Sequence, residues 1–105
     1  MIRKQDNIVE VLCTFKDIPT LAMFIEAAAQ ASAAFEIDNN IKLKIGFLTV
    51  AKDIKLLKDL KEKRYVLRVE IEAEINNIKQ FYFEAFEEFG DMKYVSGHFT
   101  LVLQE

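Results

Sequence analysis

The chain has 105 residues, about half of them apolar, and a formal net charge of −3 at pH 7. A chain of this length has room for one hydrophobic core, so we expect a single domain over residues 1–105. Lysine and glutamate are interleaved along the sequence, which leaves no basic face for a phosphate backbone and argues against nucleic acid as a partner. No stretch approaches the roughly 20 uninterrupted apolar residues that cross a bilayer. We therefore expect a cytoplasmic protein that does not contact a membrane.

The first predicted elements are a strand and a helix. Segment 8–15 is β-branched and apolar, which is typical of a strand. Segment 17–20, Asp-Ile-Pro-Thr, supplies a helix start, because Asp or Thr caps free amides and Pro is tolerated in the first turn. The helix is expected from about Thr20 to Phe35, and its only polar residues after the cap are Glu26, Gln30 and Ser32. A helix with so few polar positions is expected to be buried on most sides.

The remainder of the chain alternates between apolar and polar residues. Strands are expected at 41–47, 65–75, 78–89 and 94–103, with 48–57 as a further candidate. Asn76-Asn77 fits a two-residue hairpin turn, because Asn accepts a positive φ more readily than other non-glycine residues, and Gly90-Asp91 fits the next turn. Several strands with one helix inserted early predict an α+β fold, an antiparallel sheet with the helix packed on one face.

The helix carries a resemblance to a known family. Segment 25–31, Ile-Glu-Ala-Ala-Ala-Gln-Ala, resembles the central helix of the β-hydroxyacyl-acyl-carrier-protein dehydratases, and the layout of 35–103 is similar too. The resemblance implies a hot-dog fold, in which one long central helix is wrapped by a curved antiparallel sheet of about five to six strands. It also implies a homodimer whose sheets join edge to edge, with a tunnel for an acyl chain at the subunit interface.

The chain departs from this family in its histidine. The dehydratases carry a Gly-His-Phe-Pro-Gly stretch shortly before the helix, and its His abstracts the α proton of the acyl thioester. The corresponding region here, 11–20, contains no His. The only histidine, His98, follows Gly97 in the last predicted strand and lacks the Pro-Gly. Alternation places it on the more polar face of that strand, so we interpret it as an ordinary solvent-facing residue.

Glu26 is the candidate catalytic residue. A carboxylate in an otherwise apolar helix costs free energy unless it is solvated or paired, so a carboxylate retained there can have a catalytic role. It could act as a general acid or base whose pKa is raised by desolvation, beside a thioester carbonyl held by amides at the helix start. Alternatively, Glu26 and Gln30, spaced i and i+4, could form the narrow exposed stripe of a mostly buried helix. The substrate-binding candidates are Met23, Phe24, Gln30, Phe81 and Phe83.

Two function hypotheses stay open. The first is a protein that binds acyl thioesters of coenzyme A or acyl carrier protein, either a thioesterase or a divergent dehydratase. With the His missing, hydrolysis by a Glu26-activated water is preferred over dehydration, which needs both a base and an acid. The second is a catalytically silent domain that binds an acyl chain or a protein partner. The single Cys13 has no second Cys or His nearby, so we expect no disulfide, no metal and no cofactor.

Overall fold

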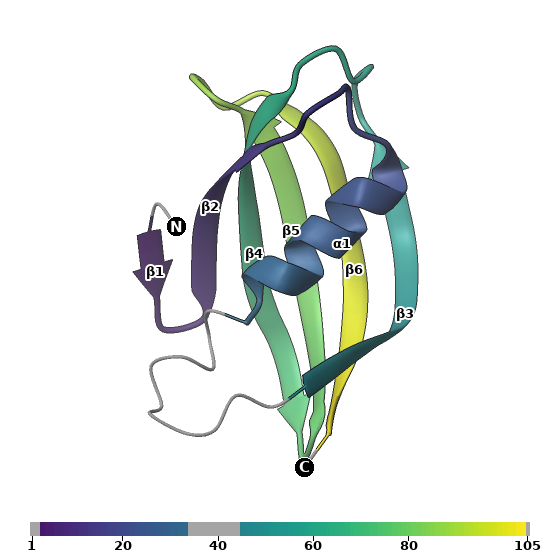
Figure 1. Cartoon of the computed structure of the whole chain (residues 1–105). Coiled ribbons are helices and arrows are strands. Elements are labelled where there is room, and N and C mark those ends of the chain that lie inside the picture. Colours follow the sequence, from purple (N-terminus) through teal and green to yellow (C-terminus); the bar gives the residue numbers. More distant parts are fainter. Residues whose placement is uncertain (1–2, 34–44, 105) are drawn as a thin grey trace.

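The computed structural model describes residues 3–33 and 45–104. The elements in chain order are β1 (Arg3–Gln5), β2 (Ile8–Thr14), α1 (Leu21–Ala31), β3 (Ile45–Leu56), β4 (Arg64–Ile75), β5 (Ile78–Glu87) and β6 (Lys93–Gln104). All the strands belong to one six-stranded sheet of order β1-β2-β4-β5-β6-β3, in which every neighbouring pair is antiparallel (Figure 1). Strand β1 has only three residues, so β3 forms the long edge of the sheet among the described residues.

The middle of the sheet is a meander of β4, β5 and β6, in which sequence neighbours pair. Asn76, in the turn between β4 and β5, has a φ of 55°, which confirms the hairpin predicted there. Gly90, in the loop between β5 and β6, has a φ of 139°, a conformation that favours glycine. Strands β2 and β3 then flank this meander, and they come from the two sides of the helix in the sequence.

Helix α1 has clear signals at both ends. The Thr20 hydroxyl accepts a hydrogen bond from the Met23 backbone N–H at 3.3 Å, so Thr20 is the N-cap, one of the two capping residues that the sequence offered. At the other end the Ser32 N–H donates to the Ala28 carbonyl, and the Ser32 hydroxyl donates to the Ala29 carbonyl at 2.6 Å. These bonds satisfy two of the last four carbonyl groups of a helix of eleven residues.

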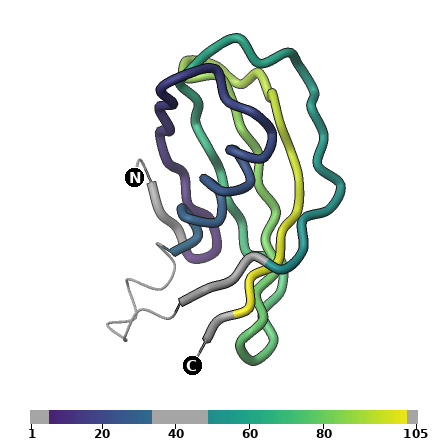
Figure 2. The backbone as a smooth tube through the Cα atoms, turned by 45° about the vertical axis from the view of Figure 1, so that its right-hand side comes forward, coloured from purple at the N-terminus to yellow at the C-terminus, as the bar shows by residue number. Residues whose placement is uncertain are grey.

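The expected fold, a hot-dog fold with a long central helix wrapped by a sheet, is therefore wrong. The structure has one short helix across one face of the sheet, and the fold is mostly β (Figures 1 and 2). The apolar run predicted a helix from Thr20 to Phe35, because alanine has the highest helix propensity and does not interrupt an apolar pattern. The observed helix ends at Ala31, and Phe35 lies outside the described residues.

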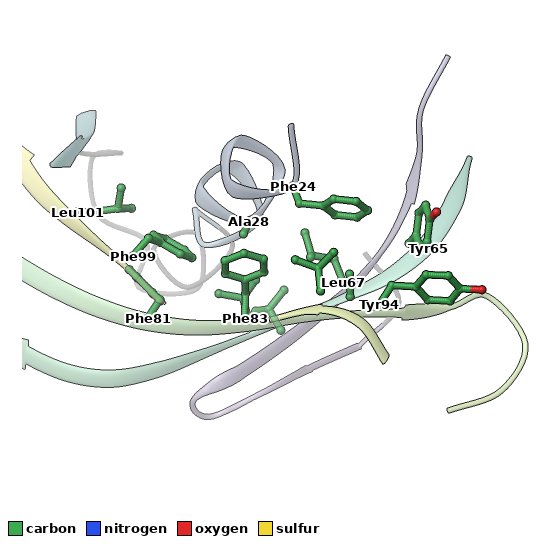
Figure 3. Packing of buried hydrophobic residues seen from close by; sticks show 13 residues of the cluster. Phe24, Ala28, Tyr65, Leu67, Phe81, Phe83, Tyr94, Phe99 and Leu101 are labelled. Atoms are coloured by element: carbon green, nitrogen blue, oxygen red, sulfur yellow. The ribbon is translucent and has the colours of Figure 1, made fainter. Parts of the chain in front are cut away.

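The core lies between the helix and the sheet (Figure 3). Phe24 and Ala28 are the two fully buried residues of the helix, and the strands supply the other large side chains. The Phe24 ring meets the rings of Tyr65 and Phe15 edge to face, with centroids 5.0 and 5.2 Å apart. Ala28 has no side chain beyond Cβ, which lets the helix lie close to the strands. The largest fully buried side chains are those of Phe24 in the helix and of Tyr65, Phe81, Phe83 and Phe99 in the sheet.

Candidate functional site

The outward side of α1 carries the residues that the sequence singled out. Ala22, Met23, Glu26 and Gln30 are exposed there, whereas Phe24 and Ala28 face the sheet. Glu26 and Gln30 lie one turn apart, so a carboxylate and an amide share a surface of small and apolar residues. We call the surface formed by Ala22, Met23, Glu26 and Gln30 the helix strip. Because Glu26 is exposed, a single chain does not give it the desolvated surroundings that the catalytic hypothesis requires.

The predicted aromatic binding residues lie on the other side of the helix. Phe24, Phe81 and Phe83 have exposed fractions of 0, 1 and 0 per cent, and they fill the core (Figure 3). Met23 is exposed, and its sulfur accepts a hydrogen bond from the Thr20 backbone N–H at 3.5 Å. Within one chain the structure therefore brings Glu26 and Gln30 together with Met23, but it separates them from the three phenylalanines.

A second group of polar residues lies on the face of the sheet opposite the helix. On β4, β5 and β6, the residues that alternate with the core positions are paired with one another across the strands. The His98 Nδ1 atom lies 2.5 Å from the Glu72 Oε1 atom. The Tyr82 ring lies against the His98 ring with a centroid distance of 4.9 Å, and the Tyr82 hydroxyl donates to Glu84 at 3.0 Å. Glu84 also forms an ion pair with Lys93.

We call the group formed by Glu72, Tyr82, Glu84, Lys93 and His98 the outer-face network. From the sequence, His98 was expected to be an ordinary solvent-facing residue. In the structure Glu84 is 9 per cent exposed and the His98 side chain is 30 per cent exposed. The register of β5 against β6 explains why Glu84 and His98 lie near each other. Tyr82 is the direct partner of His98, and Glu84, two residues further along β5, is the direct partner of Ser96.

The network borders a hollow of about 380 Å³ near the β3 edge. Its polar lining consists of Lys52, Asp53, Glu72, Gln80, His98 and Thr100. Strand β3 is irregular beside this hollow, because its register against β6 shifts between Lys52 and Lys55, and Asp53 has a φ of 52°. A larger hollow of about 490 Å³ lies at the loop end of the sheet, where Ile18, Phe89 and Tyr94 are among its lining residues.

The electrostatics of the network follow from its pairing. Burial is the main cause that raises the pKa of the Tyr82 hydroxyl, and the hydrogen bond to Glu84 raises it further. The hydrogen bond to Glu84 is also the main cause that raises the pKa of Lys93. Both shifts keep the proton on the group that donates to Glu84, so Glu84 stabilises the protonated form of each partner.

Other reactive groups in the described residues offer less chemistry. Burial raises the pKa of the Cys13 thiol, which disfavours the thiolate that a nucleophilic cysteine needs. Residues 3–33 and 45–104 contain no group of three or more His, Cys, Asp or Glu side chains that could hold a metal ion. In that same part of the chain, no helix has the length and apolar character needed to cross a membrane.

Comparison with known proteins adds a fold relationship. No protein-family model and no curated protein matches this chain. A similar solved structure is the crystal structure of the hypothetical protein SAV0944 of Staphylococcus aureus, in a variant that carries a glutamate-to-alanine substitution. The match has a TM-score of 0.76 at 10 per cent identity, and it covers 98 per cent of this chain and 90 per cent of the other. At this identity the match shows that the two proteins share a fold.

Proposed function

We propose that this protein binds acyl thioesters of coenzyme A or acyl carrier protein at the helix strip and hydrolyses them with Glu26 as the general base. The observation that supports this proposal is the pairing of Glu26 with Gln30 on an otherwise small and apolar helix surface. The apolar part suits an acyl chain, and the amide and carboxylate suit the thioester and an attacking water. A cytoplasmic location is part of the same proposal.

The strip needs a second copy of the chain to become an enclosed site. Strand β3 ends the sheet, and Val50 on it is 50 per cent exposed. A free edge of this length pairs readily with another strand. Antiparallel pairing of two β3 edges around a two-fold axis places both helices on the same face of one continuous sheet. The partner's helix then lies on the same face of the joined sheet as the helix strip, and a second chain that covers the strip would remove Glu26 from bulk water.

The proposed reaction is hydrolysis. The Glu26 carboxylate takes a proton from water while the water oxygen bonds to the thioester carbonyl carbon. The tetrahedral intermediate then expels the thiolate, which receives that proton, so a carboxylic acid and a thiol are released.

The second candidate is a catalytically silent module that binds an acyl chain or a protein partner. The filled core favours it, because Phe24, Phe81 and Phe83 are buried in the core and so do not line the helix strip. The two candidates differ in turnover, since the silent module would bind thioesters without hydrolysing them.

The test combines oligomeric state with turnover. Light scattering at micromolar concentration should give a dimer, and a panel of acyl-CoA and acyl-carrier-protein thioesters should be hydrolysed. Glu26→Gln should lower turnover by about two to four orders of magnitude with the fold retained. The matched control is Glu62→Gln, which changes an exposed carboxylate in the loop between β3 and β4. A monomer, or a wild-type rate in Glu26→Gln, would contradict the catalytic proposal.

A further inference from the structure

The contact between Glu72 and His98 fixes the imidazole in a defined way. An ionised carboxylate is only an acceptor, so at the 2.5 Å separation the His98 Nδ1 atom donates its proton to Glu72. In the neutral imidazole the lone pair is then on Nε2. A carboxylate that orients an imidazole in this way is the arrangement that makes His an effective general base.

The surroundings of His98 restrict its movement. The Tyr82 ring lies against the imidazole at a centroid distance of 4.9 Å and a tilt of 49°. The hydroxyl of Tyr82 is itself held by Glu84, which is 9 per cent exposed and paired with Lys93. A side chain supported by partners that are fixed themselves keeps its orientation, and this lowers the entropy lost when a reaction proceeds.

The hollow beside the network supplies room and further polar groups. Lys52 is the direct partner of His98 across β3 and β6, so an ammonium group and an imidazole start from adjacent backbone positions. Gln80 and Thr100 are likewise direct partners, and both line the same hollow as His98. A volume of about 380 Å³ accommodates a small organic molecule rather than a long acyl chain.

We propose that the Glu72 and His98 pair is a second hydrolytic centre, which cleaves small carboxylic esters in the hollow on the outer face of the sheet. His98 Nε2 removes a proton from water, and the water oxygen bonds to the ester carbonyl carbon. Lys52 offers a positive charge to the developing oxyanion. The intermediate expels the alcohol oxygen, which takes the proton from His98 Nε2, so that the acid and the alcohol leave and His98 is regenerated.

This centre goes beyond the proposed thioesterase site, because it lies on the other face of the sheet and uses none of the helix residues. The probe is 4-nitrophenyl acetate, which is followed by release of 4-nitrophenolate. Acylation of lysines releases a limited burst, so the rate is taken after several tens of turnovers per chain. The reference is N-acetylhistidine amide at the same concentration, since any exposed imidazole cleaves this ester slowly.

The wild-type rate should exceed that of the reference by at least about tenfold, within the range typical of general-base catalysis. His98→Gln should reduce the rate of ester cleavage to that of the buffer alone. Glu72→Gln should lower the rate at least about tenfold, while circular dichroism shows a retained fold. The matched control is Glu70→Gln, which changes a half-buried carboxylate on the same face of β4.

Two results would overturn the proposal. The first is a wild-type rate no higher than that of the reference, which would make His98 an ordinary surface imidazole. The second is a wild-type rate in a folded Glu72→Gln variant, which would show that the carboxylate does not assist the imidazole. Glu72→Gln also keeps the test valid if His98→Gln does not fold.

Discussion

Replacing Phe24 distinguishes a core residue from a residue that lines a ligand tunnel. Its side chain is fully buried, and its ring contacts those of Phe15 and Tyr65. Truncation of a buried Phe to Ala costs about 3–5 kcal/mol, since both the transfer free energy and the packing around the cavity are lost. A domain of this size has a free energy of unfolding of about 5–15 kcal/mol, so Phe24→Ala should leave the fold marginal.

The assay is urea denaturation followed by tyrosine fluorescence and circular dichroism. With an m value of about 1 kcal/mol/M, the midpoint should fall by roughly 3–5 M. The control is Met23→Ala, one residue away and 36 per cent exposed, which should cost less than about 1 kcal/mol. Phe24→Leu should lose less and keeps the test informative if the Ala variant does not fold. Equal midpoints for Phe24→Ala and Met23→Ala would refute the assignment of Phe24 to the core.

The remaining predictions concern the sheet. A Cβ atom at Gly97 would overlap Ile54 Cδ1 and lie 3.0 Å from Phe83 Cε1, so Gly97→Ala should lower the free energy of unfolding by about 1–3 kcal/mol. Ile54→Val removes that Cδ1 atom, so in a double-mutant cycle Gly97→Ala should cost less free energy of unfolding in the Ile54→Val background than in the wild type. Strictly additive free-energy losses would contradict this explanation. The pKa of Tyr82 is raised by burial and by Glu84, so the folded chain holds this proton to higher pH than the unfolded chain. The contribution of this proton to stability should be complete below about pH 10 and lost as the pH rises through the folded pKa. Urea midpoints measured across this pH range should therefore fall less steeply with pH in Tyr82→Phe than in the wild type. The same slope of midpoint against pH in both proteins would contradict the assignment.

Most of the strands and turns could be predicted from the sequence because their signals are local. Strand β1 was not predicted, and β3 (Ile45–Leu56) is one strand where two segments, 41–47 and 48–57, were expected; residues 41–44 lie outside the described residues. The alternation of Leu67, Val69 and Ile71 with charged residues identified the inner face of β4, and the first two of these are fully buried. The hairpin at Asn76 and the cap at Thr20 were predicted from the residue types that those positions require. The length of the helix was not, because alanine continues an apolar pattern without showing where the helix ends.

The outer-face network could not be predicted, since it depends on strand register. Glu72 and His98 are 26 residues apart in the sequence, and only the pairing of β4, β5 and β6 brings them together. An irregularity in the register between Ile71 and Ala73 also affects where Glu72 lies, and no residue type in the sequence signals it.

The prediction that Phe24, Phe81 and Phe83 bind substrate was made from aromatic character, which core and binding residues share.

Binding of acyl thioesters at the helix strip can be measured from the amide chemical shifts of the ¹⁵N-labelled protein. The ligand is a thioether analogue of an acyl-CoA, which binds without being hydrolysed. We expect saturable shifts at Glu26, Gln30 and neighbouring residues of α1, with the amides of Tyr82 and Glu84 on the opposite face unaffected. An absence of shifts at millimolar analogue, or shifts confined to residues outside α1, would contradict it.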